Sequence, residues 1–453
     1  MTRANLVFDV GKTNAKLIAI DANGAVLREL RHANRVLSAP PYPHIDVDAQ
    51  WDFLIAGLAE MTRHYEVDGI IPVTHGATAA VTDAAGQLVL PVLDYEAAIP
   101  DPVSATYDTI RPAFSETASP GLPNGLNLGR QLFWLARAFP DAFAKTRAIL
   151  TFPQYWSFRL TGTFASEVTS LGCHTDLWAP DARDFSSLVD RLEWRPLFPG
   201  LKRADAVLGH VDPKLCNGQS VRVLSGLHDS NASFLPHLVS SEGAFSVLST
   251  GTWVIAMAGK TPLGSLTQHR DTLANCDVFG HPVPTARFMG GREYELLAPK
   301  GMVGASVAIE ELLWVIDQGG MILPNQGGEG GPFPGRRGTL IGGVPDDPRK
   351  HHALVLLYLA LMADRCLDLI GASGPLTIEG PFARNRAFAQ LLSGLRGQKV
   401  NCADGQAGTT AGAHILLHGE GQCQTSALSV RPAAEIATAL RAYRWKWCEV
   451  VLG

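Results

Sequence analysis

The fold is decided by a polar stretch near the N-terminus, residues 9–16, which read Asp-Val-Gly-Lys-Thr-Asn-Ala-Lys. The apolar residues 6–8 before this stretch and 17–20 after it predict two strands joined by a polar turn. An Asn-Gly pair at 23–24 predicts a hairpin turn into a third strand. We therefore expect a β-meander at the start of the chain.

The Gly-Lys-Thr triplet at 11–13 does not match a Walker phosphate loop. That loop needs a glycine five residues upstream and runs into a helix, whereas position 6 is Leu and a strand follows. The stretch still suits a phosphate with its magnesium ion, because Asp9 is a ligand type for hydrated Mg²⁺. Four further side chains supply positive charge, a hydroxyl and an amide: Lys12, Thr13, Asn14 and Lys16. An ordinary polar hairpin turn is the alternative interpretation of the stretch alone.

A similar strand–turn–strand unit recurs about 240 residues later, at 244–257. Its turn contains Thr250, Gly251 and Thr252, and it predicts either a second phosphate-binding turn or a plain turn. Between the two units, a strand at 221–226 leads into His228 and Asp229. An Asp in that place is often a helix N-cap, so the order of the three motifs carries more weight than any one of them.

Apolar periodicity predicts the remaining elements. A helix is expected at 49–65 and a strand at 69–73, followed by Thr74-His75-Gly76. A hairpin is expected to pair residues 79–81 with 88–90. Further helices are expected at 127–148, 351–369, 385–395 and 407–417, a strand at 376–381, and a loop at the glycine-rich residues 327–335.

Composition excludes several classes of protein. The chain has 453 residues, 18% of them charged, and a formal net charge of -5, which predicts two to three globular domains and no basic face for nucleic acid or anionic membrane. We expect no signal peptide, and the longest apolar stretch, 353–363, is too short to span a membrane. Seven cysteines without a Cys-x-x-Cys pair predict reduced thiols, no zinc site and a cytoplasmic location.

Taken in order, these motifs resemble the FGGY family of sugar kinases. The resemblance covers about residues 5–418 and is nearest to the rhamnulokinase and fuculokinase branches, through Gly-Leu-His-Asp at 226–229 and Leu-Ser-Thr-Gly-Thr-Trp at 248–253. Arg-Leu-Thr-Gly at 159–162 also resembles a family segment. Residues 379–385, Glu-Gly-Pro-Phe-Ala-Arg-Asn, resemble the family's adenosine motif.

The resemblance implies an α/β protein with the actin/hexokinase/Hsp70-like ATPase fold, in which two ribonuclease-H-like domains flank a cleft. We expect a sugar and phosphate domain at 1–238 and a nucleotide domain at 239–453. The implied reaction transfers a phosphoryl group from ATP, with Mg²⁺ held by Asp9, to a primary hydroxyl of a small ketose or polyol, and Asp229 is the general base. The implied ATP contacts are Lys12, Thr13, Asn14, Lys16, Thr250, Gly251, Thr252, Gly380, Pro381 and Asn385. The implied substrate contacts are His75, Gly76, His228 and Asn275.

Three departures from the family pattern matter for this site. Pro381 stands where the family has glycine, so we expect adenine to pack against Pro381 and Phe382 with few hydrogen bonds to the base. His75 replaces an aromatic or polar residue on the sugar side, and Lys16 replaces an arginine. The expected partner is a small sugar, with a monomer or homodimer as the assembly. A non-catalytic nucleotide-binding protein and an ATPase on the same fold are the alternatives, and the presence of Asp9 and Asp229 favours the kinase.

Overall fold

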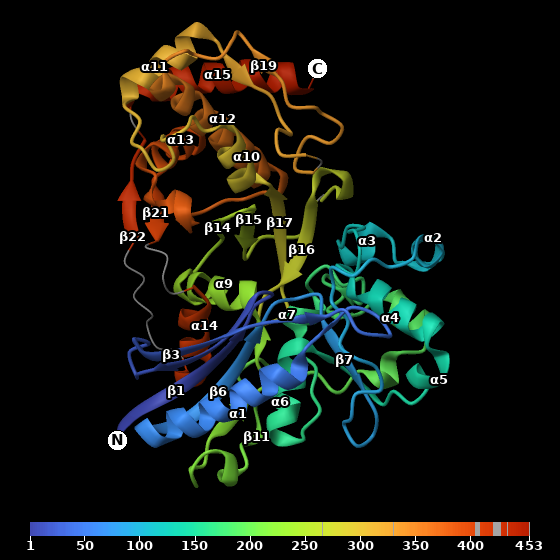
Figure 1. The fold of residues 1–453 in the computed structure, drawn as a ribbon. Helices are drawn as coiled ribbons and strands as arrows, with labels where there is room; N and C mark the ends of the chain where they lie inside the picture. Colours follow the sequence, from blue (N-terminus) through green and yellow to red (C-terminus); the bar gives the residue numbers. More distant parts are fainter. Residues whose placement is uncertain (265, 329, 404–407, 420–426, 433, 453) are drawn as a thin grey trace. The chain divides into compact units, whose positions relative to one another are not determined.

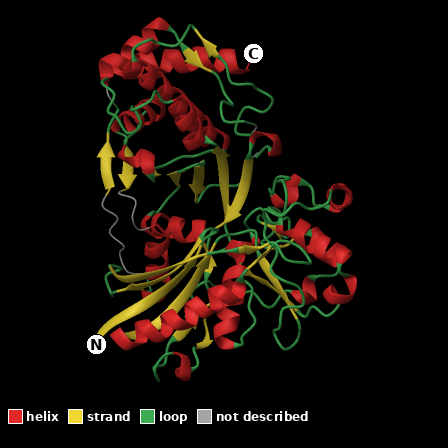
Figure 2. Ribbon diagram, viewed as in Figure 1, coloured by secondary structure: helices red, strands yellow, loops and turns green. Residues whose placement is uncertain are grey.

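The computed structural model describes residues 1–453 except 265, 329, 404–407, 420–426, 433 and 453. The chain folds as two compact units, each containing a seven-stranded sheet (Figures 1 and 2). The first unit holds residues 1–240 and 274–282 together with the helix α14 (Gly408–His418). Most of the remaining residues form the second unit. Two segments from the C-terminal half thus pack with the first unit, although no change in composition marks them.

The first sheet has the strand order β11-β12-β6-β1-β2-β3. Strands β1 (Thr2–Val10), β2 (Asn14–Ile20) and β3 (Val26–Ala33) form an antiparallel meander, which confirms the N-terminal prediction. Strand β6 (Tyr65–Thr74) pairs in parallel with β1, and β12 (Arg222–Leu224) and β13 (Leu227–His228) pair in parallel with β6. The carboxyl ends of β1, β6 and β13 therefore meet at one edge of the sheet.

Side-chain alternation along β1 assigns the two faces of this sheet. Leu6 and Phe8 pack in one apolar cluster with residues of α1 (Val47–His64) and α6 (Phe152–Thr161). Both helices are labelled in Figure 1. Asn5 points to the opposite face, where its amide lies 2.9 Å from His418 Nε2 on α14. Asp9 shares that face with Asn5. Helix α9 (Asp229–Ser240) packs tightly with α14, so the second face brings α9 close to Asp9.

One prediction in this unit is wrong, and a second holds only in part. The helix expected at 127–148 is interrupted, because Pro140 lacks the N–H that would continue it. The segment forms α4 (Leu128–Ala138), a short α5 (Pro140–Phe143) and the strand β8 (Ala148–Thr151). The expected hairpin forms only in part. The Val89 N–H donates to Val81 O at 3.0 Å and Leu88 bridges Thr82, but the main partner of β7 (Ala79–Thr82) is β8, with which it pairs antiparallel.

Shorter elements complete the first unit and add little to the site. They are β4 (Val36–Leu37), β5 (His44–Ile45), α2 (Asp101–Ile110), α3 (Phe114–Thr117), α7 (Val168–Leu171), β9 (Trp178–Ala179), β10 (Asp184–Phe185), α8 (Ser187–Arg191) and β11 (Val207–His210), with 3₁₀ turns at Arg195–Leu197 and Pro213–Leu215.

The second sheet, ordered β16-β17-β15-β14-β20-β21-β22, repeats the central arrangement of the first. Strands β14 (Phe245–Thr250), β15 (Val254–Gly259) and β17 (Pro282–Phe288) are antiparallel neighbours. Strand β20 (Leu376–Glu379) pairs in parallel with β14, and β21 (Val400–Ala403) in parallel with β20. Because β6 and β12 stand in the same relation to β1, the predicted duplication of architecture is confirmed.

Helices pack against this second sheet around α12 (Pro348–Leu369), which is buried over most of its length. The other helices are α10 (Gly290–Leu297), α11 (Ile309–Gln318), α13 (Arg386–Arg396) and α15 (Ala434–Leu452). The remaining strands are β16 (Thr272–Cys276), β18 (Met321–Ile322), β19 (Leu340–Ile341) and β22 (Ala427–Val430), and 3₁₀ turns lie at Gln268–Arg270 and Pro381–Arg384. Within the described part of the chain, no helix has both the length and the apolar character to cross a membrane.

Candidate active site

Two carboxylates define the site in the first unit. Asp9 lies opposite Lys16 in the β1–β2 register, and its Oδ2 is 3.5 Å from Lys16 Nζ. Burial raises the pKa of Asp9, Lys16 opposes this, and the charge of Asp229 adds to the rise. The two carboxylates are therefore close enough to repel each other. A divalent cation would relieve that repulsion, and carboxylate oxygens are the ligands that Mg²⁺ prefers.

Asp229 begins α9 directly after β13, and one third of its side chain is exposed. Its Oδ1 accepts a hydrogen bond from the Ser230 backbone N–H at 2.6 Å and lies 3.2 Å from His228 Nε2. Burial raises the pKa of Asp229, while His75 and the Ser230 hydrogen bonds lower it. The result is a carboxylate held in one orientation with an accessible face, as a general base requires.

The ring of His228 is held by its protein neighbours. The Asn231 amide lies 3.3 Å from Nδ1, and Nε2 faces Asp229 and, at 3.8 Å, the Cys173 sulfur. An amide that donates to Nδ1 leaves the ring proton on Nε2, the nitrogen that faces Asp229 and Cys173. Burial lowers the pKa of His228 to about 4, so the ring is neutral at physiological pH.

Sequence reasoning missed a buried glutamate behind His228. Glu167 is fully buried at the start of α7, and its Oε2 accepts from the Thr169 N–H at 3.0 Å and the Thr169 hydroxyl at 2.5 Å. The Thr169 hydroxyl in turn accepts from the His228 backbone N–H at 3.0 Å. This chain of hydrogen bonds holds β13 just before Asp229. A Glu-x-Thr spacing at a helix start is common, so the sequence offered no distinctive signal.

The turn that is predicted to contact the sugar follows β6, next to β13 and Asp229. His75 follows β6, its N–H donates to Val10 O at 2.9 Å, and its Nδ1 lies 2.9 Å from Gly76 O. A Cβ at Gly76 would come within 3.0 Å of His228 Nε2. A larger residue at position 76 would therefore press against the imidazole of His228. Burial lowers the pKa of His75, and the charge of Asp229 opposes this.

Lys12 makes contacts that the sequence did not indicate. Its ammonium forms ion pairs with Asp94 and, at 3.3 Å, with Glu96 Oε2, and it lies 4.4 Å from the centroid of the Tyr95 ring. The rest of the turn is closed locally, with Gly11 N donating to Asn14 O at 2.9 Å and the Asn14 amide donating to the Thr13 hydroxyl at 3.0 Å.

Asn275 belongs to β16, in the short segment that packs with the first unit. Its neighbour Ala274 donates to Ala118 O at 3.0 Å, and a Cβ at Gly172 would lie 2.5 Å from the Cys276 sulfur. These contacts place Asn275 near the residues that precede Cys173. Its proposed role toward substrate stays a prediction.

In the second unit, the predicted phosphate turn and adenosine motif meet. The Thr250 hydroxyl donates to Glu379 O and accepts from Phe382 N at 3.1 Å. Gly380 has φ +79°, and a Cβ there would lie 2.0 Å from Thr250 O. Gly251 N closes the turn onto Trp253 O at 2.9 Å. This junction of backbone groups requires glycine and exposes Pro381 at the surface.

Two side chains of the adenosine motif have structural partners. Phe382 is buried and its ring lies 5.0 Å from that of Phe388 and 5.2 Å from that of Tyr294. The expectation that Phe382 offers its ring to adenine is therefore wrong, because the ring belongs to the core. Asn385 caps α13 by accepting from Phe388 N at 3.0 Å.

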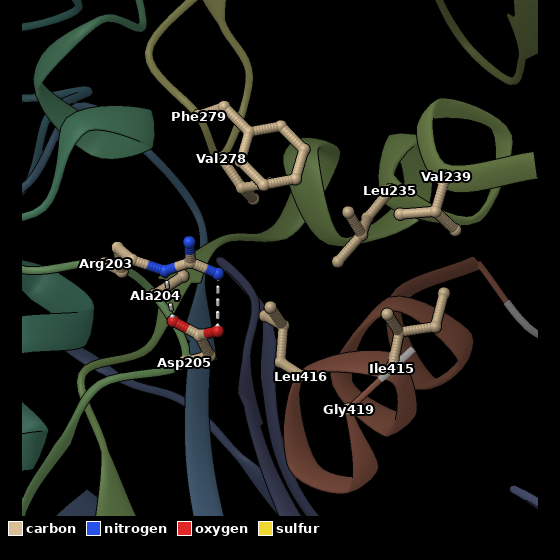
Figure 3. A pocket seen from close by; sticks show the side chains of 10 residues that line it. All are labelled: Arg203, Ala204, Asp205, Leu235, Val239, Val278, Phe279, Ile415, Leu416 and Gly419. Carbon is tan, nitrogen blue, oxygen red and sulfur yellow. Dashed lines mark hydrogen bonds and ion pairs between the residues drawn. The ribbon is translucent and has the colours of Figure 1, made fainter. Parts of the chain in front are cut away.

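A separate pocket in the first unit lies beyond these groups (Figure 3). It is lined by the later turns of α9, including Leu235 and Val239, by Ile415 on α14 and by Phe279. Arg203 and Asp205 form an ion pair at its edge, at 2.8 Å. Leu235 is six positions after Asp229, about 9 Å along a helix, so the pocket is distinct from the carboxylate site.

Two sheets of the same topology, with the carboxylates at strand ends, define an α/β protein of the actin/hexokinase-like class. Comparison with sequence models of known protein families then identifies the family within this class. The N-terminal domain of the FGGY family of carbohydrate kinases matches residues 4–236, and the C-terminal domain of carbohydrate kinase FGGY matches residues 242–426. The chain therefore belongs to the FGGY family of carbohydrate kinases, and the resemblance noted in the sequence is confirmed.

Several relatives and solved structures agree with this assignment. An L-fuculokinase from Salmonella typhi is 27% identical over 290 residues, which are 60% of this chain and 60% of that protein. The matched region thus spans less than two thirds of that curated relative. A carbohydrate kinase from Novosphingobium aromaticivorans has a TM-score of 0.92 and 38% identity over 100% of this chain and 99% of that chain. A xylulose kinase from Rhodospirillum rubrum, with a TM-score of 0.78 and 18% identity over 99% and 98% of the two chains, shows the fold alone.

Proposed function

We propose that this protein phosphorylates a primary hydroxyl of a small ketose or polyol, with Mg-ATP as donor and Asp229 as general base. The observation that carries the proposal is the position of Asp229. It follows a parallel strand next to β6, it interacts electrostatically with Asp9, and His228 and Ser230 orient it. A non-catalytic nucleotide-binding protein would not need this oriented base, and an ATPase would not need the substrate-side turn at His75 and Gly76.

The proposed chemical step is a single in-line displacement. The sugar hydroxyl oxygen forms a bond to the γ-phosphorus, the bond to the β,γ-bridging oxygen breaks, and ADP leaves. The hydroxyl proton passes to Asp229, whose accessible carboxylate face accepts it late in the transfer. His228 supports the step by placing Nε2 3.2 Å from Asp229 Oδ1, which leaves the other carboxylate oxygen for the hydroxyl.

The phosphates and metal are assigned to two sets of residues. In the first unit, Asp9 would hold Mg²⁺ through water, and the ion would neutralise phosphate charge. Lys16 lies beside Asp9 and supplies a cation for the same phosphates. In the second unit, the backbone junction of Thr250 with Gly380 provides the turns for the nucleotide. The further proposed ATP contacts are Thr13, Asn14, Gly251, Thr252, Pro381 and Asn385. Lys12, which the resemblance also implies as an ATP contact, is ion-paired with Asp94 and Glu96 and is not assigned to the phosphates.

The acceptor is assigned to the turn at His75 and Gly76, together with His228 and Asn275. His75 presents its ring beside Tyr95, with the centroids 5.4 Å apart, close to the base. Because L-fuculokinases are among the relatives, a deoxyketohexose is the first acceptor to examine. Other ketoses and polyols follow in the same panel.

The test is a coupled ADP-release assay with MgATP across ketoses, polyols and aldonates, on wild type and Asp229→Asn. The proposal expects release that depends on one class of sugar and is lost in the variant. Release without any sugar would support the ATPase alternative. Tight ATP binding without release under all conditions would support the binding-protein alternative.

A further inference from the structure

Lys12 occupies a position that, by family resemblance, contacts the donor phosphates. In this structure, however, its side chain contacts the loop at residues 94–96. The ammonium forms ion pairs with Asp94 and Glu96, and it sits over the Tyr95 ring, so three consecutive residues of one loop hold it. Lys16 lies instead beside Asp9. The two lysines of the N-terminal turn therefore serve different partners.

The loop that holds Lys12 lies on the acceptor side of the base. Tyr95 packs against His75, with the ring centroids 5.4 Å apart. Burial raises the pKa of Tyr95 to about 12, and the charges of Glu96, Asp94 and Asp229 add to the rise. The charges of Lys12 and Asp229 both act on His75. Lys12, Tyr95 and His75 thus form one continuous group of contacts, on which the charge of Asp229 acts.

The surroundings of the Lys12–Asp94 ion pair stabilise it. The Asp94 side chain is 9% exposed and that of Lys12 is 23% exposed. Asp94 also accepts from the Glu96 backbone N–H at 3.3 Å, which fixes the loop around the pair. Removing Lys12 from a buried carboxylate is costly, because the remaining charge has no compensation. A donor phosphate would have to compete with both carboxylates for this ammonium.

We propose that Lys12, Asp94 and Tyr95 form a specificity-determining wall of the acceptor site, and that this wall selects a neutral polyhydroxylated acceptor over an anionic one. An ammonium paired with a carboxylate offers donors and acceptors that match sugar hydroxyls. In this wall one lysine pairs with two carboxylates, Asp94 and Glu96, so the charge of the wall is net negative. That charge disfavours an aldonate carboxylate. This inference rests on the proposed kinase function.

The test compares Lys12→Met with the matched control Lys16→Met. Apparent KM values are measured separately for the best neutral sugar and for ATP, and folding is checked by thermal unfolding. We expect Lys12→Met to raise KM for the sugar at least about tenfold and KM for ATP less than about threefold. The reason is that an acceptor site binds its substrate less well when a polar group that contacts the substrate hydroxyls is removed. Lys16→Met should show the reverse pattern. Lys12→Arg keeps the charge and should recover part of the sugar affinity.

Two further measurements keep the inference open to refutation. Calorimetry measures the affinity of Lys12→Met and Asp94→Asn for the sugar in the absence of ATP, and it does not depend on turnover. A failure of the kinase proposal can therefore be told apart from a failure of the proposed acceptor wall. Asp94→Asn removes one negative charge and should increase the relative use of aldonates. The inference is overturned if Lys12→Met raises KM for ATP alone, if it changes neither constant, or if wild type prefers aldonates to neutral sugars.

Discussion

Replacing the buried Glu167 with glutamine tests how the carboxylate behind the base affects stability. Glu167 is fully buried, and burial raises its pKa from an ordinary value of 4.5 to about 7, against the hydrogen bonds from Thr169. One pKa unit corresponds to about 1.36 kcal/mol, so the rise corresponds to roughly 3 kcal/mol. The carboxylate form is therefore disfavoured in the folded protein by that amount.

The direction of the effect follows from the raised pKa. Folding favours the protonated acid, so its stabilising contribution is complete below about pH 4.5 and is lost as the pH rises to about 7. Glutamine does not ionise in this range. The free energy of unfolding of Glu167→Gln, relative to wild type, should thus increase by roughly 3 kcal/mol between pH 4.5 and pH 8. The new amide N–H adds a cost of about 1–3 kcal/mol if it finds no acceptor, but that cost does not vary with pH.

Urea unfolding at several pH values measures this difference, with Glu66→Gln as the control. Glu66 lies in the same unit and its side chain is 55% exposed, so that variant should follow wild type across the range. A difference between Glu167→Gln and wild type that stays flat from pH 4.5 to pH 8 would refute the reasoning. Because Thr169 links Glu167 to the His228 backbone, kcat should also fall in the variant while KM for ATP stays near wild type.

Three other substitutions address the chemistry directly. Asp229→Asn should lower kcat at least about 10²-fold with the fold retained, the usual scale for a general base, and near-wild-type turnover in the ADP-release assay would remove Asp229 from the mechanism. Asp9→Ala should abolish Mg²⁺-dependent activity in a magnesium titration, and an unchanged titration would make Asp9 a turn residue only. Pro381→Gly should leave the affinity for ATP unchanged or improved, because proline has no N–H to lose. For wild type, a kcat/KM preference for ATP over GTP above about 10³-fold would contradict a pocket with little polar recognition of the base.

Local patterns predicted the elements that are formed by neighbours in sequence. The meander of β1, β2 and β3 has short turns, so the alternation of apolar residues and the Asn-Gly turn were sufficient. The same holds for α1 and for the recurrence of the strand–turn–strand unit as β14 and β15. The strand β7 was predicted, but its pairing with β8 was not, because β8 lies more than sixty residues away and has no local mark.

The sequence by itself determined the family, the two-sheet architecture and the motifs with Asp9, His75 and Asp229, because each motif ends a strand whose pattern is readable locally. Only the tertiary structure decided what those motifs contact. Lys12 forms an ion pair with Asp94, which is 82 positions away in the sequence. The Thr169 hydroxyl accepts a hydrogen bond from the backbone N–H of His228, which is 59 positions away. Parallel strand pairing creates such contacts by placing distant strand ends at one edge. Charge and hydrogen-bond partners at that edge follow from the packed fold, since no spacing along the chain encodes them.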